Sequence, residues 1–150
     1  MTFDTLLVAN RVEIACRILR SATAIGLRTV AVFSDSDRGA PHVAMADEAI
    51  HIGATPVRES YLHAERILEA AAATGAGAIH PGYGLLSEDA AFAAAVEAAG
   101  MRFVGPAPAQ IELFGAKDRA RELARRSWPA AACSPTPARP RRPPSGSATR

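Results

Sequence analysis

Residues 76–84 read Ala-Gly-Ala-Ile-His-Pro-Gly-Tyr-Gly, a short apolar run that ends in two glycines around a tyrosine. The run Ala76–Ile79 predicts a strand, and the glycines predict a turn in which the backbone adopts positive φ and approaches a ligand closely. Ser87 predicts the N-cap of the following helix, whose free N–H groups and positive dipole end favour anions. We therefore expect the site in this loop, with the polar ring of Tyr83 facing a ligand.

Short apolar strands alternate with amphipathic helices on both sides of this stretch. The expected strands are Thr5–Ala9, Thr29–Phe33, Glu48–Ile52, Ala76–Ile79 and Arg102–Val104. The expected helices are Val12–Ile25, a short one from Pro41, one from an N-cap at Ser60 up to Gly75, one from Ser87 to Gly100, and two more at Pro108–Phe114 and Asp118–Arg126. This alternation predicts an α/β fold, a Rossmann-like parallel sheet of about five strands with helices on both faces.

The helical period also predicts which side chains face the core. The inward stripes are Ile14, Ile18, Ala22 and Ile25; Leu62, Ile67, Leu68 and Ala71; and Phe92, Ala95, Val96 and Ala99. In an open parallel sheet, ligands bind outside the carboxyl ends of the strands, near the point where the strand order reverses. Three loops are expected at that edge: Asn10–Glu13, His80–Ser87 and Gly105–Pro108.

Charge and proline are distributed unevenly along the 150 residues. Residues 1–124 hold eleven Lys and Arg against fifteen Asp and Glu, whereas residues 125–150 hold six arginines, no acidic residue and six of the eleven prolines. A composition without apolar period cannot bury enough surface to fold, which predicts a disordered basic tail at residues 127–150. Its arginines lack interleaved aromatics and an amphipathic period, so neither nucleic acid nor a membrane is the expected partner.

The two cysteines form no disulfide framework and indicate no oxidising compartment. Cys16 falls within an amphipathic helix and is expected to be a small buried side chain, while Cys133 lies in the tail. The apolar run Leu6–Ala9 is too short for a signal peptide or a membrane span. We expect a cytoplasmic protein.

Five motifs occur in register over the first 124 residues. They are Asn10-Arg11-Val12-Glu13-Ile14-Ala15, Ala46-Asp47-Glu48-Ala49, Ser60-Tyr61-Leu62, His80-Pro81-Gly82-Tyr83-Gly84-Leu85-Leu86-Ser87-Glu88 and Phe103-Val104-Gly105-Pro106. Together they closely resemble the N-terminal, pre-ATP-grasp domain of biotin carboxylase, as in acyl-CoA, pyruvate and urea carboxylases. The resemblance implies such a domain at residues 1–115, followed at residues 116–126 by the start of a linker helix towards an ATP-grasp domain that this sequence lacks.

The resemblance implies an ATP-dependent ligase that carboxylates biotin with bicarbonate and MgATP. Tyr83 corresponds to a tyrosine of the biotin and bicarbonate site, with Gly82 and Gly84 as further binding residues, and Lys117 resembles the lysine that reaches the nucleotide phosphates. The implied partners are biotin carboxyl carrier and carboxyltransferase components, and a homodimer is left open. The final carboxyl acceptor, whether acyl-CoA, pyruvate or urea, is chosen in this family by the carboxyltransferase and is left open as well.

The chain departs from the family pattern at Val12, more mildly at Leu85 and Asp89, at Ala116, and at its end. Val12 stands where the family has glycine, a replacement that costs on the order of 1–3 kcal/mol if the position needs positive φ. After Arg126 the sequence turns abruptly into the basic tail, as a shift of reading frame would produce. We therefore expect a truncated chain without catalytic residues or metal ligands, which binds ATP, biotin and Mg²⁺ weakly and is inactive alone.

Several residues also have a structural interpretation. His80 is expected to bond to its own loop rather than to act as a general base, and Glu88 and Asp89 are expected to support the dipole of the helix that they begin. His42, His51 and His63 lack the spacing of a metal site. The alternative function is a non-catalytic module that binds a nucleotide or dimerises.

Overall fold

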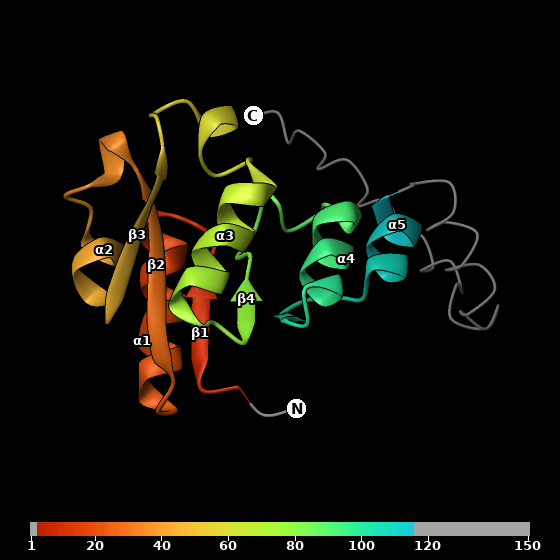
Figure 1. Cartoon of the computed structure of the whole chain (residues 1–150), viewed down its shortest axis with the longest axis horizontal. Coiled ribbons are helices and arrows are strands. Elements are labelled where there is room, and N and C mark those ends of the chain that lie inside the picture. The colour runs from red at the N-terminus through yellow and green to blue at the C-terminus, as the bar shows by residue number, and fades with distance from the viewer. Residues whose placement is uncertain (1–2, 116–150) are drawn as a thin grey trace, which may run out of the picture.

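The computed structural model describes residues 3–115, in which five parallel strands form one sheet (Figure 1). The strands lie in the order β3-β2-β1-β4-β5. They are β1 (Thr5–Val8), β2 (Arg28–Ser34), β3 (Glu48–Gly53), β4 (Ala78–His80) and β5 (Arg102–Phe103). The predicted α/β fold, with its five strands in a parallel sheet, is confirmed.

Helices cover both faces of this sheet, as the alternating pattern predicts. The helix α1 (Val12–Ala24) lies behind the sheet in Figure 1 with α2 (Pro41–Met45) packed against it, and α3 (Ala64–Thr74) lies in front. The helix α4 (Ala90–Ala98) shares the face of α3, and α5 (Pro108–Gly115) packs against α4. Two single 3₁₀ turns, η1 (Asp35–Asp37) and η2 (Val57–Glu59), follow β2 and β3.

The chain starts at the centre of the sheet and runs outward in both directions. From β1 it passes through β2 to the edge strand β3, and then returns through α3 to add β4 on the other side of β1. Val8 at the end of β1 is therefore paired with Ala31 of β2 and with His80 of β4. The strand order reverses beside β1, so the loops that follow β1 and β4 meet at the topological switch point.

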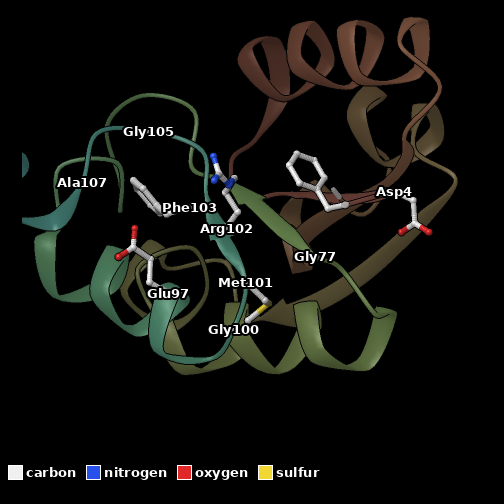
Figure 2. Close-up of a pocket in the computed structure, with 10 residues that line it drawn as sticks. Asp4, Gly77, Glu97, Gly100, Met101, Arg102, Phe103, Gly105 and Ala107 are labelled. Carbon is white, nitrogen blue, oxygen red and sulfur yellow. The ribbon is translucent and has the colours of Figure 1, made fainter. Parts of the chain in front are cut away.

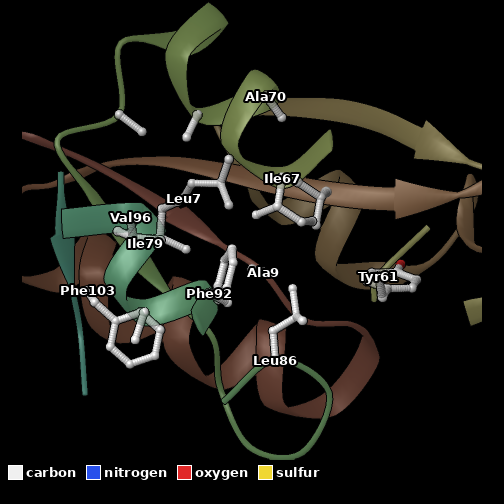
Figure 3. Close-up of a cluster of buried hydrophobic side chains, with 14 of the residues drawn as sticks. Leu7, Ala9, Tyr61, Ile67, Ala70, Ile79, Leu86, Phe92, Val96 and Phe103 are labelled. Carbon is white, nitrogen blue, oxygen red and sulfur yellow. The ribbon is translucent and has the colours of Figure 1, made fainter. Parts of the chain in front are cut away.

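The larger hydrophobic cluster lies between the sheet and the helices α3 and α4 (Figure 3). Its strand side chains include Leu7, Val30 and Ile79, and the helices contribute Ile67, Phe92 and Val96. The rings of Phe92 and Phe103 meet edge to face, with their centroids 6.1 Å apart. Because each such fully buried side chain contributes about 1.5–3 kcal/mol, this cluster supplies much of the stability of the sheet.

The smaller cluster lies between the sheet and α1. Leu6 and Val8 of β1 pack there against the stripe Ile14, Ile18 and Ala22. Successive residues of a strand point to opposite faces, so the continuous apolar run of β1 supplies both clusters. Cys16 is a buried free thiol on the same helix, as the sequence predicts.

Three helices end at the glycines that the sequence marks as stops. Gly26, Gly75 and Gly100 have φ of 81°, 68° and 78°, which is the left-handed conformation typical of the residue after a helix. A side chain with a Cβ is disfavoured there, so each glycine fixes the helix end.

The predicted N-caps at Ser60 and Ser87 are wrong. Ser60 is buried and its hydroxyl donates to the carbonyl of Pro56 at 3.0 Å, which closes the turn around η2 before α3 begins at Ala64. The cap of α4 is Asp89, whose carboxylate accepts from the N–H of Phe92 at 2.9 Å. The structural role expected for Asp89 is therefore confirmed, while the turn at Ser87 belongs to the loop.

Three side chains that the helical period placed inward are exposed. Ile25 is 76% exposed because it follows the last residue of α1 and its φ of −99° has already left the helix. Leu62 is 41% exposed because α3 starts two residues later, so Leu62 lies on no helical stripe. Ala99 is likewise exposed one residue past the end of α4.

No helix in the described part of the chain is both long and apolar enough to traverse a lipid bilayer. The predicted helix Asp118–Arg126, the predicted phosphate-binding Lys117 and the predicted disordered tail all lie outside the described residues.

Candidate functional site

The candidate site is the carboxyl edge of the sheet beside β1, where residues 10–12, 34–37 and 80–87 follow β1, β2 and β4. Arg11, Val12 and residues 82–85 are exposed or half-buried there, while Asn10 and Asp37 are buried beneath them. Parallel sheets place ligands at this edge because the strand ends diverge at the switch point. The structure thus brings together two of the three loops that the sequence places there.

The loop after β4 adopts the turn that its glycines predict. Gly82 and Gly84 have φ of 72° and 61°, and Leu85 adds a third left-handed residue with φ of 49°. Between the glycines, the Tyr83 side chain is 65% exposed. The predicted binding residues Gly82, Tyr83 and Gly84 therefore form one protruding turn with the phenol on its outside.

Asn10 packs under this turn from the loop after β1. Its side-chain nitrogen donates to the carbonyls of Pro81 and Tyr83 at 2.7 and 3.0 Å. A Cβ added at Gly82 would lie only 2.6 Å from the same nitrogen, so glycine is required there by space as well as by φ. The sequence places Asn10 at the correct edge, but its contact with residues 81–83 was missed.

His80 has the structural role that the sequence favours. Its Nδ1 accepts from the N–H of Gly82 at 3.0 Å, which leaves the proton of a neutral ring on Nε2. Burial lowers the pKa of His80 below the ordinary value of 6.5. The ring is therefore neutral at physiological pH and holds the start of the turn.

A buried carboxylate, Asp37, organises the loop after β2. It accepts from Arg11 Nη2 at 2.7 Å, from the Ser34 hydroxyl at 3.0 Å and from the Tyr61 hydroxyl at 2.8 Å. The guanidinium of Arg11 also lies over the ring of Tyr61, 5.5 Å from its centroid. Burial, followed by the bond to Asp37, raises the pKa of Tyr61 well above its usual range, so this phenol remains protonated.

The members of this cluster, Arg11, Ser34, Asp37 and Tyr61, are not among the site residues that the sequence predicts. Asp37, Tyr61 and Ser34 are buried and fully bonded within the fold, so they stabilise the edge rather than face a ligand. A carboxylate that follows a buried strand is the one sequence signal that could have found them.

Val12, the first residue of α1, has the positive φ that is strained for a β-branched side chain. Its φ is 48°, in the left-handed region, and its side chain is 44% exposed. The N–H of Val12 is directed to His42 Nδ1 at 3.3 Å, and His42 Nε2 lies 3.2 Å from the carbonyl of Val32. Burial, the main cause, lowers the pKa of His42, so its ring is neutral and bonded on both sides.

Two hollows offer space for a ligand near these elements. A groove of about 400 Å³ between α1 and β4 is lined by apolar side chains of α1 together with His80, Gly82 and Tyr83. A larger hollow of about 670 Å³ lies beside the edge strand β5, between Asp4, Gly77 and Arg102 (Figure 2). None of its lining residues belongs to the loops after β1, β2 or β4. We assign the site to the smaller groove because His80, Gly82 and Tyr83, at the end of β4 and in the loop after it, line that groove.

The third predicted loop, Gly105–Pro108, lies at a different hollow. Pro106 lines a space of about 570 Å³ together with Ser87, Glu88 and Gly115. This hollow lies next to the last described residue, two positions before Lys117. Within residues 3–115, no three His, Cys, Asp or Glu side chains are grouped as metal ligands.

Comparison with known proteins identifies this architecture. The model of the family "Biotin carboxylase, N-terminal domain" matches residues 2–111. The alpha subunit of mitochondrial methylcrotonoyl-CoA carboxylase from Oryza sativa subsp. japonica is 54% identical over 120 residues, which cover 80% of this chain and 16% of that protein. The biotin carboxylase of Halalkalibacterium halodurans is 53% identical over 119 residues, covering 79% of this chain and 26% of that protein.

Solved structures agree with this match. The biotin carboxylase domain of a thermophilic 2-oxoglutarate carboxylase bound to bicarbonate superposes with a TM-score of 0.81 at 47% identity, over 85% of this chain and 28% of that one. The urea amidolyase of K. lactis gives a TM-score of 0.82 at 43% identity, over 83% of this chain and 8% of that one. The chain spans much less than half the length of each of these relatives. By the family match, by sequence identity and by fold, the chain belongs to the biotin carboxylase N-terminal domain family.

Proposed function

We propose that this chain forms the N-terminal wall of a biotin carboxylase site, in which an ATP-dependent ligase carboxylates biotin with bicarbonate. The observation that carries the proposal is the exposed Tyr83 phenol between two left-handed glycines at the switch point. A hydroxyl on a turn that is fixed from below can donate to a ureido or carboxylate oxygen. Relatives that share this domain include a protein solved with bicarbonate bound, which supports this substrate class.

Within this function the described residues bind and orient rather than catalyse. Tyr83 contacts biotin or bicarbonate, and Gly82 and Gly84 let the backbone approach it. The ATP and Mg²⁺ of the reaction supply phosphoryl transfer to bicarbonate, a step that depends on electrostatic stabilisation of the transferred group. The magnesium ligands are proposed to lie in a part of the enzyme other than this domain. Lys117 is proposed to reach the nucleotide phosphates.

A titration tests the proposed role of Tyr83 in the chain itself. Free biotin and bicarbonate, added together at millimolar concentration to the ¹⁵N-labelled chain, are expected to shift the amide signals of Gly82, Tyr83 and Gly84. Tyr83→Phe is the matched control, because it removes only the hydroxyl, and it is expected to reduce the shifts. Shifts confined to the hollow beside β5, or shifts that Tyr83→Phe leaves unchanged, would contradict the proposal.

A second assay tests whether the chain acts alone. Because the transition-state electrostatics of phosphoryl transfer come from groups outside the described domain, we expect no bicarbonate-dependent ATP hydrolysis in the presence of free biotin. Clear turnover by the purified chain would show that the reaction needs less of the enzyme than we propose. In the whole enzyme, a biotin carboxyl carrier and a carboxyltransferase component are the proposed partners.

A second candidate function, dimerisation, is favoured by the surface of α1. Ile25 is 76% exposed at the end of this helix, beside the apolar groove that also includes Ile14 and Ile18. One relative was solved as a biotin carboxylase domain dimer. Light scattering on the chain and on Ile25→Lys tests this, with Leu62→Lys as a control on the other side of the sheet. A dimer that only Ile25→Lys weakens supports the candidate, and a monomeric parent chain excludes it.

A further inference from the structure

Asn10 connects the two loops that meet at the switch point, and its side chain is almost completely buried, with 4% of it exposed. The same carboxamide that donates to Pro81 and Tyr83 accepts the N–H of Arg11 on its oxygen at 2.9 Å. All three bonds have good length for N–H···O hydrogen bonds. One side chain thus joins backbone segments that are 71 and 73 residues apart in sequence.

The turn around Tyr83 makes few other hydrogen bonds, although Leu85 and Leu86 after it pack on the core. The N–H of Gly82 is bonded to His80 and the carbonyl of Gly84 accepts from Ser87, but both bonds stay within the loop. Tyr83 is 65% exposed, and its hydroxyl makes no hydrogen bond to any residue in the range 3–115. The direction of the phenol therefore depends on the backbone of its own turn, and beyond His80 that backbone is bonded to the central strand through Asn10.

With its bonds to Pro81, Tyr83 and Arg11, the Asn10 side chain acts as a clamp between the two loops. The loop after β1, which carries Asn10, is held in place as well. Arg11, whose N–H the Asn10 oxygen accepts, is held through its guanidinium by the buried carboxylate of Asp37. The Asp37 carboxylate also accepts from the hydroxyls of Ser34 and Tyr61, both of which are buried. A side chain that spans two loops and is anchored at its base in this way orients the loop that it bonds, as supporting residues of binding sites do.

We propose that Asn10 is a positioning residue for Tyr83, which orients the phenol through the carbonyls on either side of Gly82. The inference rests on the proposed function for the role of Tyr83, but it is tested on the position of the ring alone. Removing the donor pair leaves the part of the turn that carries Tyr83 held only by its own loop and by the packing of Leu85 and Leu86 further along, so the ring samples more directions.

Fluorine NMR tests this in the full chain. The sequence has two tyrosines, Tyr61 and Tyr83, so fluorotyrosine labelling gives one buried reporter and one exposed reporter. In Asn10→Ala, the Tyr83 signal is expected to move towards the shift of free fluorotyrosine, while the Tyr61 signal stays in place. Thr29→Val is the matched control, because it removes the buried hydroxyl that bonds Asp47 at the opposite edge of the sheet. It should leave both signals unchanged.

Asn10→Asp separates positioning from general loss of packing. The new side chain keeps the size of asparagine and an acceptor for the N–H of Arg11, but at neutral pH it turns an oxygen towards two carbonyls. Its Tyr83 signal is expected to resemble that of Asn10→Ala at neutral pH. On acidification the introduced carboxyl regains a proton donor, so the signal should return towards that of the parent chain, which Asn10→Ala at the same pH cannot do.

A Tyr83 signal that is the same in the parent chain and in Asn10→Ala would overturn the inference. Should Asn10→Ala not fold, proton exchange of the Asn10 carboxamide in the parent chain decides the point. Exchange slowed at least about tenfold relative to an exposed amide supports the clamp, and unslowed exchange overturns it. Failure of the proposed function has a different signature, since biotin and bicarbonate would then leave a well-positioned Tyr83 unshifted.

Discussion

The two tyrosines of this chain lie near the same edge of the sheet and differ in almost every physical respect. Tyr61 is completely buried, with its hydroxyl bonded to the carboxylate of Asp37. Tyr83 is 65% exposed and lies between two glycines with positive φ. One phenol completes a buried polar cluster, and the other is presented to solvent on a turn that a single carboxamide supports.

The difference shows how rigidity and access are divided at this edge. The Tyr61 side has a buried charge with three side-chain donors, so changes there should cost stability. On the Tyr83 side the phenol itself is exposed and no charge is buried, so changes to Tyr83 should alter the loop and its ligands more than the fold. Stability measurements on the two sides test that division.

The largest effect is expected from Asp37→Ala on the Tyr61 side. It leaves the hydroxyls of Ser34 and Tyr61 buried without their acceptor and removes the partner of Arg11, so the free energy of unfolding should fall by about 3 kcal/mol. Urea denaturation followed by circular dichroism measures this. Asp35→Ala, on the exposed neighbour in the same 3₁₀ turn, should change it by less than about 0.5 kcal/mol. Equal losses in the two variants would refute the assigned role of the buried cluster.

The next effect is expected at Gly82, where the two sides are connected through Asn10. Gly82→Ala forces a Cβ into left-handed backbone and against the Asn10 nitrogen, and we expect a loss of about 2 kcal/mol. Gly84→Ala has the same backbone problem, with a φ of 61°, but its Cβ would meet nothing within 4 Å. It should cost about 1 kcal/mol. The difference between these two variants measures the contact with Asn10, and no difference would argue against it.

A smaller effect of the opposite sign is expected at Val12. Val12→Gly removes a β-branched side chain from a φ of 48°, and the relief of strain should exceed the entropy lost with glycine. We expect a gain of about 1 kcal/mol in thermal or urea denaturation. Glu13→Gly, one residue further into α1, should instead lose about 1 kcal/mol. A loss in both variants would show that Val12 is not strained.

The smallest effect on the free energy of unfolding is expected just below neutral pH, and it comes from the two half-buried or buried histidines, His80 and His42. Burial lowers the pKa of His42 and of His80, so the folded chain keeps both rings neutral while the unfolded chain protonates them near 6.5. Unfolding therefore takes up protons, and the stability present above 6.5 is lost as the pH falls below it. His80→Asn retains an acceptor for the N–H of Gly82 and removes one of these protons. Its stability should fall less between pH 7 and pH 5.5 than that of the parent chain, and an equal or steeper fall would contradict the assignment.

Much of the fold follows from local patterns in the sequence. The apolar runs of β1 and β2 and the glycines at 26, 75 and 100 locate strands and helix ends because their physical causes are local. The predicted caps are wrong because a serine oxygen has other local partners: Ser60 bonds the carbonyl of Pro56, and at α4 the carboxylate of Asp89, not Ser87, reaches the free N–H.

The candidate site is predictable in part for the same reason. The turn at Tyr83 is visible from its two glycines and from the strand before it. The clamp at Asn10 and the cluster at Asp37 join residues that are far apart in sequence, between 24 and 73 positions for the bonds to Tyr61 and Tyr83. No local period encodes such contacts: the Asp37 cluster forms when the segments after β1, after β2 and before α3 meet, and the Asn10 clamp forms when β4 is aligned beside β1.

The central position of β1 links the folding of this domain to the completion of its site. Its first neighbour, β2, is made soon after it, but its second neighbour begins only at Ala78, and contacts of such long sequence separation form late. During synthesis on the ribosome, one side of β1 therefore waits unpaired until residues 78–80 emerge. Pairing of β4 with β1 also brings Pro81 and Tyr83 to Asn10, so a newly made chain completes its central strand and positions the Tyr83 turn in a single event, before β5 is added beside β4.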